Sequence, residues 1–212
     1  MLVIKDKISK QEISTMSHVI FDGEITVIDN DAQLEEAIND LRQHSILGID
    51  SETRPSFRKG NIHKVALLQV STDDHCYLFR LNKLGLSSPI IALLEDENVM
   101  KVGLSLKDDF LSLRRRTQVD PKNCLDLQNV VKNFGVKDLS LQKIYANFFG
   151  KKISKSQRLS NWEADELAES QKRYASTDAW TCLKIYELLE KLKESGDYQL
   201  QIMEQPETEV KE

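Results

Sequence analysis

The sequence predicts an α/β fold built on a mixed sheet, in which an antiparallel meander is joined to a parallel βαβ part. Three apolar, β-rich stretches follow one another at 46–51, 65–71 and 75–81, and a tight polar turn separates the last two. Closely spaced strands of this kind are typical of antiparallel hairpins. From about residue 100 onward, strand patterns alternate with helical ones, which favours parallel pairing. Helices are expected on both faces of the sheet.

The first half of the chain supplies the elements that lead into the meander. Residues 25–28 alternate around Thr26 and predict a strand. The segment 31–44 carries apolar residues at helical spacing after the capping sequence Asp29-Asn30-Asp31, so a helix is expected there. The stretch 53–64 contains proline, glycine and several basic residues, and it predicts a loop within the meander.

The second half supplies the parallel part and the last helix. Strands are expected at 100–105 and 123–126, and helices at 87–94, 107–116, 127–134 and 139–149. Leu111 is expected to face inward with the other apolar residues of its helix. A final helical segment runs from Glu163 to about Lys193, and we expect it to break near residues 169–171.

Composition divides the chain into three regions. Residues 1–23 have mixed polarity and predict an N-terminal extension with one short helix. Residues 24–193 hold nearly all the regular patterns and predict one folded domain. Residues 194–212 contain six acids and one lysine, so an acidic, disordered tail is expected. The net charge of −5 resides in this tail, and the rest of the chain is balanced.

Two basic clusters stand out within the balanced part. One is Arg114-Arg115-Arg116, and the other places Lys151, Lys152, Lys155 and Arg158 in a stretch without an acid. Such clusters hint at contacts with phosphate, and the alternative is a pair of solvated faces.

Targeting and redox features indicate a cytoplasmic protein. No apolar stretch is long enough to span a bilayer, and the N-terminus lacks the apolar core of a signal peptide, so no membrane partner is expected. The three cysteines, Cys76, Cys124 and Cys182, are scattered without a metal-binding spacing. We expect them to be reduced thiols in the cytosol.

The stretch 46–53, with the sequence ILGIDSET, places two carboxylates at the end of a buried strand. Asp50 and Glu52 are two positions apart, so on a strand they point to the same face. Two like charges held side by side repel each other unless a cation lies between them, and carboxylate oxygens suit Mg²⁺ or Mn²⁺. The alternative is an edge strand with two solvated acids.

Further acids lie on other predicted elements. Asp108 and Asp109 follow the strand at 100–105, and α/β sheets bind ligands at the carboxyl ends of their strands. Helix N-capping is the alternative role for an aspartate there. Tyr174 and Asp178 share a helix face, with small neighbours that let the helix approach a crowded site. An ordinary amphipathic helix, with tyrosine in the core and aspartate exposed, is the alternative.

Taken together, these residues resemble the DEDDy group of 3′→5′ exonucleases, which includes RNase D, the exonuclease domain of the Werner syndrome helicase and the proofreading domains of polymerases. The resemblance rests on three stretches, GIDSET at 48–53, KVGLSLKDDFLSLRRR at 101–116 and RLSNWEADELAESQKRYASTDAW at 158–180. The third is the most specific, because it follows the RNase D and Werner pattern over more than twenty residues. The resemblance implies a ribonuclease H-like fold, with residues 24–193 as the 3′→5′ exonuclease domain.

The resemblance also implies which residues form the site. Its metal-binding acids would be Asp50, Glu52, Asp109 and Asp178, which would hold two divalent ions, Mg²⁺ or Mn²⁺. Tyr174 would be the tyrosine that names the subgroup. Spacing from Lys101-Val102-Gly103 favours Asp109 over Asp108. One departure is Ser105, where several relatives have Asn or Gly, and it concerns substrate contacts near this strand rather than the acids.

The implied function is hydrolysis of phosphodiester bonds in DNA or RNA from the 3′ end, with release of nucleoside 5′-monophosphates by a two-metal-ion mechanism. The expected partner is a single-stranded or 3′-ended nucleic acid. Arg158, Asn161 and Trp162 would contact it, and a place in the core is the alternative for Trp162. Two other functions stay open: a non-catalytic nucleic-acid-binding protein that kept the fold, and a hydrolase of short oligonucleotides.

Overall fold

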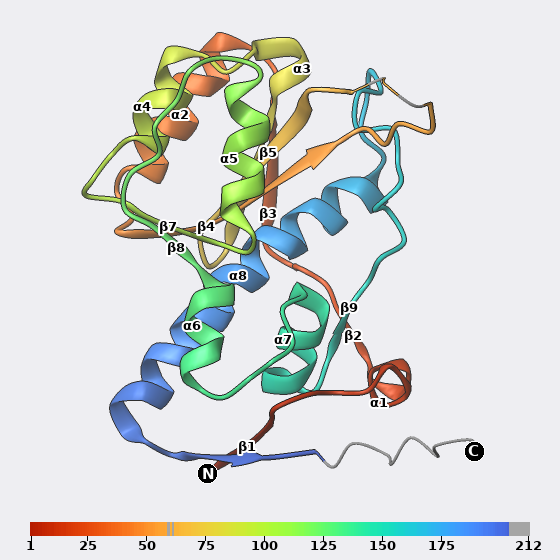
Figure 1. Ribbon diagram of the computed structural model, residues 1–212. Helices are drawn as coiled ribbons and strands as arrows, with labels where there is room; N and C mark the ends of the chain where they lie inside the picture. Colours follow the sequence, from red (N-terminus) through yellow and green to blue (C-terminus); the bar gives the residue numbers. More distant parts are fainter. Residues whose placement is uncertain (59, 61, 204–212) are drawn as a thin grey trace.

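A six-stranded mixed sheet forms the centre of the computed structural model, which describes residues 1–58, 60 and 62–203 (Figure 1). In spatial order its strands are β3 (Glu24–Ile28), β6 (His75–Arg80), β5 (Val65–Ser71), β4 (Ile46–Thr53), β7 (Met100–Gly103) and β8 (Cys124–Asp126). The neighbours β4, β5 and β6 are antiparallel, whereas β3 pairs with β6, β7 with β4 and β8 with β7 in parallel. The predicted meander joined to a parallel part is therefore confirmed.

Helices cover both faces of this sheet, as expected. One face carries α2 (Asp31–Leu41), α3 (Leu81–Leu84), α4 (Ser88–Leu94) and α5 (Leu106–Arg114). The other carries the long helix α8 (Glu169–Ser195), together with α6 (Leu127–Asn133) and α7 (Leu141–Phe149). Leu111 on α5 was expected to face inward, but it is 55% exposed, because it lies on the side of α5 away from the sheet.

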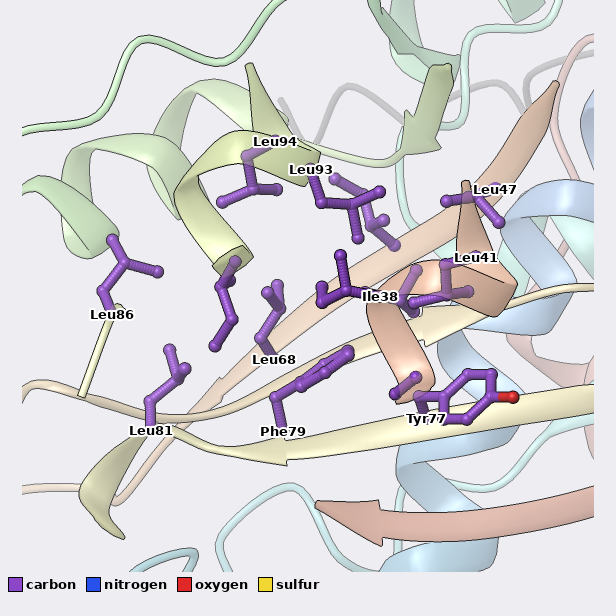
Figure 2. Packing of buried hydrophobic residues seen from close by; sticks show 14 of the residues in the cluster. Ile38, Leu41, Leu47, Leu68, Tyr77, Phe79, Leu81, Leu86, Leu93 and Leu94 are labelled. Carbon is purple, nitrogen blue, oxygen red and sulfur yellow. The ribbon is translucent and has the colours of Figure 1, made fainter. Parts of the chain in front are cut away.

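The core between the sheet and the first layer of helices holds β4 in place. Figure 2 shows Leu47 of β4 and Leu68 of β5 packed with Ile38 of α2 and Leu93 of α4. Side chains alternate along a strand, so the neighbours of Leu47 must point to the opposite face, toward α8. This alternation leaves Asp50 and Glu52 on the α8 side of the sheet.

The two ends of the described chain pair with each other. β1 (Leu2–Lys5) runs parallel to β10 (Tyr198–Gln201), and Ile4 on β1 is fully buried. We expected residues 194–212 to be disordered, and the structure differs at β10 because Tyr198 and Leu200 pack on the core and the strand finds a distant partner. Residues 204–212 lie outside the described residues.

The N-terminal segment forms a second small pairing. Its short helix, which the sequence predicts, is α1 (Lys10–Thr15), and the side chains of Ser9 and Glu12 cap it reciprocally. The following β2 (His18–Val19) runs parallel to β9 (Lys152–Ile153), beside α1 and α7 (Figure 1). Residues before 24 are therefore folded against the segment that leads into α8.

The last helix begins later than the sequence predicts. α8 starts at Glu169 and continues unbroken to Ser195, whereas we expected a start at Glu163 and a break near 169–171. The carbonyl oxygens of Ala164 and Asp165 accept hydrogen bonds from the guanidinium of the buried Arg80. Those carbonyls are held by a tertiary contact, and local helical composition does not reveal such a contact.

Candidate active site

Three carboxylates from two elements converge beside the sheet. Asp50 and Glu52 lie on β4, and Asp178 lies on α8, which packs across that strand. One carboxylate oxygen from each lies within 4.8 Å of the others. The predicted same-face placement of Asp50 and Glu52 is seen here, and Asp178 is buried rather than solvated.

Small residues bring α8 this close to β4. A Cβ built on Gly48 would lie 2.2 Å from the carbonyl oxygen of Ala179, so only glycine fits at that strand position. Ala175 and Ala179 on the facing side of α8 are fully buried. The small residues around Tyr174 and Asp178 thus do what the sequence suggested, because they let the helix backbone approach the strand.

The electrostatics of the cluster disfavour its ionised state when no cation is bound. Burial, and then the neighbouring acids Asp109, Asp178 and Glu52, raise the pKa of Asp50 well above its usual value. Burial, followed by Asp178 and Asp109, raises the pKa of Glu52 to about 9. Burial also raises the pKa of Asp178 to about 7. A divalent cation would favour the carboxylate forms of all three groups.

Asp109 lies near this cluster, in the other layer of helices. It lies in the first turn of α5, where the Ser51 hydroxyl donates a hydrogen bond to its Oδ1 at 2.5 Å. Burial raises the pKa of Asp109 to about 6. Its charge is the first of the neighbouring charges that raise the pKa of Asp50, although it lies outside the group of three carboxylates. Asp108 is exposed.

Asp126 is a functional candidate that sequence reasoning missed. At the end of β8, its carboxylate accepts hydrogen bonds from the backbone N–H groups of Ser105 at 3.2 Å, Leu106 at 3.0 Å and Gln128 at 2.9 Å. Ser105 has a positive φ of 61°, so this carboxylate holds a strained turn at the start of α5. The capping of Gln128 was visible in the sequence as an aspartate before a helix, but the contact with α5 requires the fold.

Gln69 is a second residue that the sequence did not reveal. It is the direct partner of Asp50 across β5 and β4, so the two side chains point to the same face. Gln69 is fully buried, and within the described residues neither Nε2 nor Oε1 has a hydrogen-bond partner. A buried amide without a partner beside an acid cluster fits a site that takes up further polar groups, such as a hydrated cation.

Tyr174 lies one helical turn before Asp178 on α8. Burial and the charges of Asp178 and Glu52 raise the pKa of the Tyr174 hydroxyl. The phenol therefore stays protonated at neutral pH and acts as a hydrogen-bond donor. The ring centroids of Trp162 and Tyr174 lie 6.0 Å apart, so the buried Trp162 supports the Tyr174 ring from the core side.

The three expected substrate contacts are placed differently from one another. Arg158 is exposed, and its positive charge opposes the rise in the pKa of Glu52, so it lies on the site side. Asn161 is exposed, and its Oδ1 accepts a hydrogen bond from the backbone of Glu163. Trp162 is fully buried, so it lies in the core, which was the alternative to a substrate contact.

These features define the class of the site. Carboxylates from a central strand and two helices, with a protonated tyrosine beside them, form a candidate centre for hard divalent cations and for the hydrolysis of phosphodiesters. The family model described as 3′-5′ exonuclease matches residues 25–194 of this chain. The chain belongs to this 3′-5′ exonuclease family, as the DEDDy resemblance indicated.

Individual relatives agree with this assignment. A 3′-5′ exonuclease of Arabidopsis thaliana is 30% identical over 190 residues, which cover 84% of this chain and 65% of that protein. The chain thus spans just under two thirds of that relative. The Aedes aegypti Nibbler EXO domain superposes with a TM-score of 0.74 at 23% identity and covers 83% of this chain and 91% of that one. Trypanosoma brucei RNase D, solved with RNA U12, superposes with a TM-score of 0.71 at 19% identity, over 80% of this chain and 63% of that one. The fold is therefore ribonuclease H-like.

The raised pKa values predict how the stability of the metal-free protein depends on pH. The pKa of an unfolded carboxylate is near 4, whereas burial in the folded chain raises the pKa of Asp109, Asp178 and Glu52 to about 6, 7 and 9. The folded state retains protons that the unfolded state releases, so the free energy of unfolding falls as pH rises through this window. Urea denaturation in EDTA at about pH 5 and about pH 9 measures the difference.

The matched control for this titration is Glu52→Gln, which removes one of the raised groups. Its free energy of unfolding should fall less between the two pH values, and Mg²⁺ should stabilise the wild-type protein more at the higher pH. A wild-type stability that rises over this range, or falls by the same amount as in Glu52→Gln, contradicts the electrostatic description.

Proposed function

We propose that this protein is a metal-dependent 3′→5′ exonuclease that hydrolyses phosphodiester bonds of DNA, RNA or both and releases nucleoside 5′-monophosphates. The observation that carries the proposal is the convergence of Asp50, Glu52 and Asp178 within 4.8 Å, with raised pKa values that a bound cation would reverse. Membership of the 3′-5′ exonuclease family supports it.

Two divalent ions, Mg²⁺ or Mn²⁺, would supply the charge that offsets the anionic phosphodiester and stabilises the attacking and leaving oxygens. Glu52 and Asp178 would hold one ion, and Asp109 would hold the other, directly or through water. Asp50 would contact both, because it lies beside Glu52 and Asp178 and also feels the charge of Asp109. Asp126 would keep Asp109 in place through the start of α5.

Tyr174 would orient the attacking water. Its raised pKa keeps the phenol protonated, so it can donate a hydrogen bond to a water molecule near Asp178 but cannot serve as the base at neutral pH. Arg158, whose charge acts on Glu52, and the exposed Asn161 are our candidates for contacts with the nucleic acid. The buried Trp162 would support Tyr174 from behind.

Tyr174→Phe should lower kcat about 100-fold with little change in KM, because the substrate still binds but the water is no longer oriented. Initial rates on a labelled single-stranded oligonucleotide provide the measurement. The matched control is Tyr186→Phe on the same helix, which should retain wild-type rates. Equal rates for Tyr174→Phe and the wild type would remove Tyr174 from the mechanism.

The choice of nucleic acid is tested by one set of assays. A 5′-labelled single-stranded DNA, a 3′-recessed duplex and an RNA are incubated with Mg²⁺ or Mn²⁺, and the products are resolved by length. The proposal predicts a ladder that shortens one nucleotide at a time from the 3′ end. The RNase D relative solved with RNA U12 makes RNA a necessary member of the set. Cleavage of dinucleotides alone favours the short-oligonucleotide hydrolase, and binding without cleavage favours the non-catalytic alternative.

All three cysteines of the chain are free thiols, which supports a reducing compartment such as the cytosol. Within the described residues, no helix is long and apolar enough to cross a membrane.

A further inference from the structure

The N-terminal segment and the strand β9 line a basic hollow. The N-terminal residues of this lining lie before the part of the chain that matches the exonuclease family. This hollow has a volume of about 520 Å³, and its lining residues come from α1, β2, β9 and the start of α7. These elements lie close together in Figure 1. Its basic lining residues are Lys10, His18, Lys143, Lys152 and Lys155. The family model begins at residue 25, so Lys10 and His18 lie outside it.

The charged residues that line this hollow are all basic. No carboxylate is among the residues that line it in the described part of the chain. Lys143 is paired with Asp138 at 2.5 Å, and the Lys152 ammonium donates to the carbonyl oxygen of Ser14 at 2.6 Å. Lys10 and Lys155 lie exposed, and neither takes part in an ion pair within the described residues. An anion can therefore approach them without displacing an acidic partner.

A second, largely apolar hollow adjoins this basic surface and extends to Tyr174. It has a volume of about 290 Å³, and its walls include the apolar Val19, Ile20 and Ile153 together with Tyr174. Glu169 also lines it, paired with Arg173 at 3.1 Å. Ile153 and its neighbour Ser154 also line the basic hollow, and Tyr174 lies one helical turn before Asp178 on α8. The two hollows therefore adjoin each other at β9, and the apolar one extends to Tyr174 on the helix that carries Asp178.

We propose that this surface, here named the β2–β9 track, binds the single-stranded part of the substrate on the 5′ side of the scissile bond. The inference rests on the proposed exonuclease function. Apolar walls next to Tyr174 suit nucleobases, which stack and pack on apolar side chains. The lysines beyond them suit the backbone phosphates of the following nucleotides. Bases next to the scissile bond would lie on the apolar part of the track, and the phosphates of nucleotides farther along would lie on the lysines. Only a long single strand reaches both parts, so the track favours long strands over very short substrates.

The test reverses the charge of the two exposed lysines. Lys10→Glu with Lys155→Glu should raise KM about tenfold on a long single-stranded oligonucleotide, because two phosphate contacts become repulsive. Hydrolysis of a dinucleotide, which is too short to reach the lysines, should be unchanged. The matched control is Lys132→Glu with Lys191→Glu, two exposed lysines elsewhere on the surface, which should leave KM unchanged on both substrates. An unchanged KM on the long oligonucleotide overturns the track.

A binding measurement tests the β2–β9 track independently of hydrolysis. Fluorescence anisotropy with a labelled long oligonucleotide gives the affinity at several salt concentrations. Lys10→Gln with Lys155→Gln should reduce the slope of log K against log salt by about 1.4, at about 0.7 per phosphate contact on a single strand. An unaltered slope contradicts the track, whereas binding with a reduced slope but without hydrolysis contradicts the exonuclease proposal alone.

Discussion

Asp50→Asn should lower kcat/KM on 3′-ended oligonucleotides about 1,000-fold in Mg²⁺ or Mn²⁺ while leaving the fold intact. The substitution keeps the shape of the side chain but removes the charge of the residue whose pKa is raised by Asp109, Asp178 and Glu52. In the metal-free protein the raised pKa of Asp50 already favours a neutral side chain, so the neutral amide costs little stability. The expected result is therefore a folded and inactive protein, measured by initial rates and circular dichroism.

The adjacent residues Asp108 and Asp109 provide a matched pair for comparison with this variant. Asp109→Asn should also lose most activity, because the charge of Asp109 acts on Asp50 and its carboxylate is held by Ser51. Asp108→Asn alters an exposed residue one position away and should keep wild-type rates. Wild-type activity in Asp50→Asn, or a larger loss in Asp108→Asn than in Asp109→Asn, would contradict our assignment of the acids.

Gly48→Val should reduce both stability and activity, although residue 48 has no side chain in the site. The first added carbon would lie 2.2 Å from the carbonyl oxygen of Ala179, so α8 must move away from β4. Overpacking of this kind costs about 1–3 kcal/mol of folding free energy. The same shift separates Asp178 from Asp50, and a displacement of about 1 Å at the reacting groups lowers kcat about 100-fold.

Leu47→Ala separates the two effects of Gly48→Val. Leu47 is fully buried on the same strand but packs on the opposite face, in the core shown in Figure 2. Its truncation should cost about 2–5 kcal/mol, with kcat unchanged for the folded fraction. Urea denaturation and active-site-normalised rates measure the two quantities. If Gly48→Val keeps full kcat, the close approach of α8 is not what positions Asp178.

The meander and the acid positions could be predicted because each depends on a short-range pattern. The strand at 46–53 shows its buried face and its paired carboxylates within eight residues. Tyr174 and Asp178 lie four residues apart on one continuous helix, so helical geometry alone places them together. That β4 and α8 meet was suggested by their small residues, and the structure shows the contact at Gly48 and Ala179.

Other features depend on partners that are distant in the sequence. Asp126 contacts the start of α5 about twenty residues earlier, and no local pattern indicates that bond. β10 lies in a polar and acidic stretch, but it becomes a strand because β1, from the other end of the chain, pairs with it. The start of α8 depends on Arg80, which binds the carbonyls that a longer helix would have used. Long-range contacts override local propensity in all three cases.

Binding of Mn²⁺ measured together with hydrolysis tests the account most directly. Free Mn²⁺ is quantified by electron paramagnetic resonance in samples of the wild-type protein and Asp50→Asn, and the rate of 3′-end hydrolysis is recorded in the same samples. We predict that hydrolysis appears at the Mn²⁺ concentration at which the wild-type protein binds the ion, and that Asp50→Asn loses both. Hydrolysis that persists in EDTA, or equal Mn²⁺ binding by the two proteins, would contradict a metal centre built on Asp50, Glu52 and Asp178.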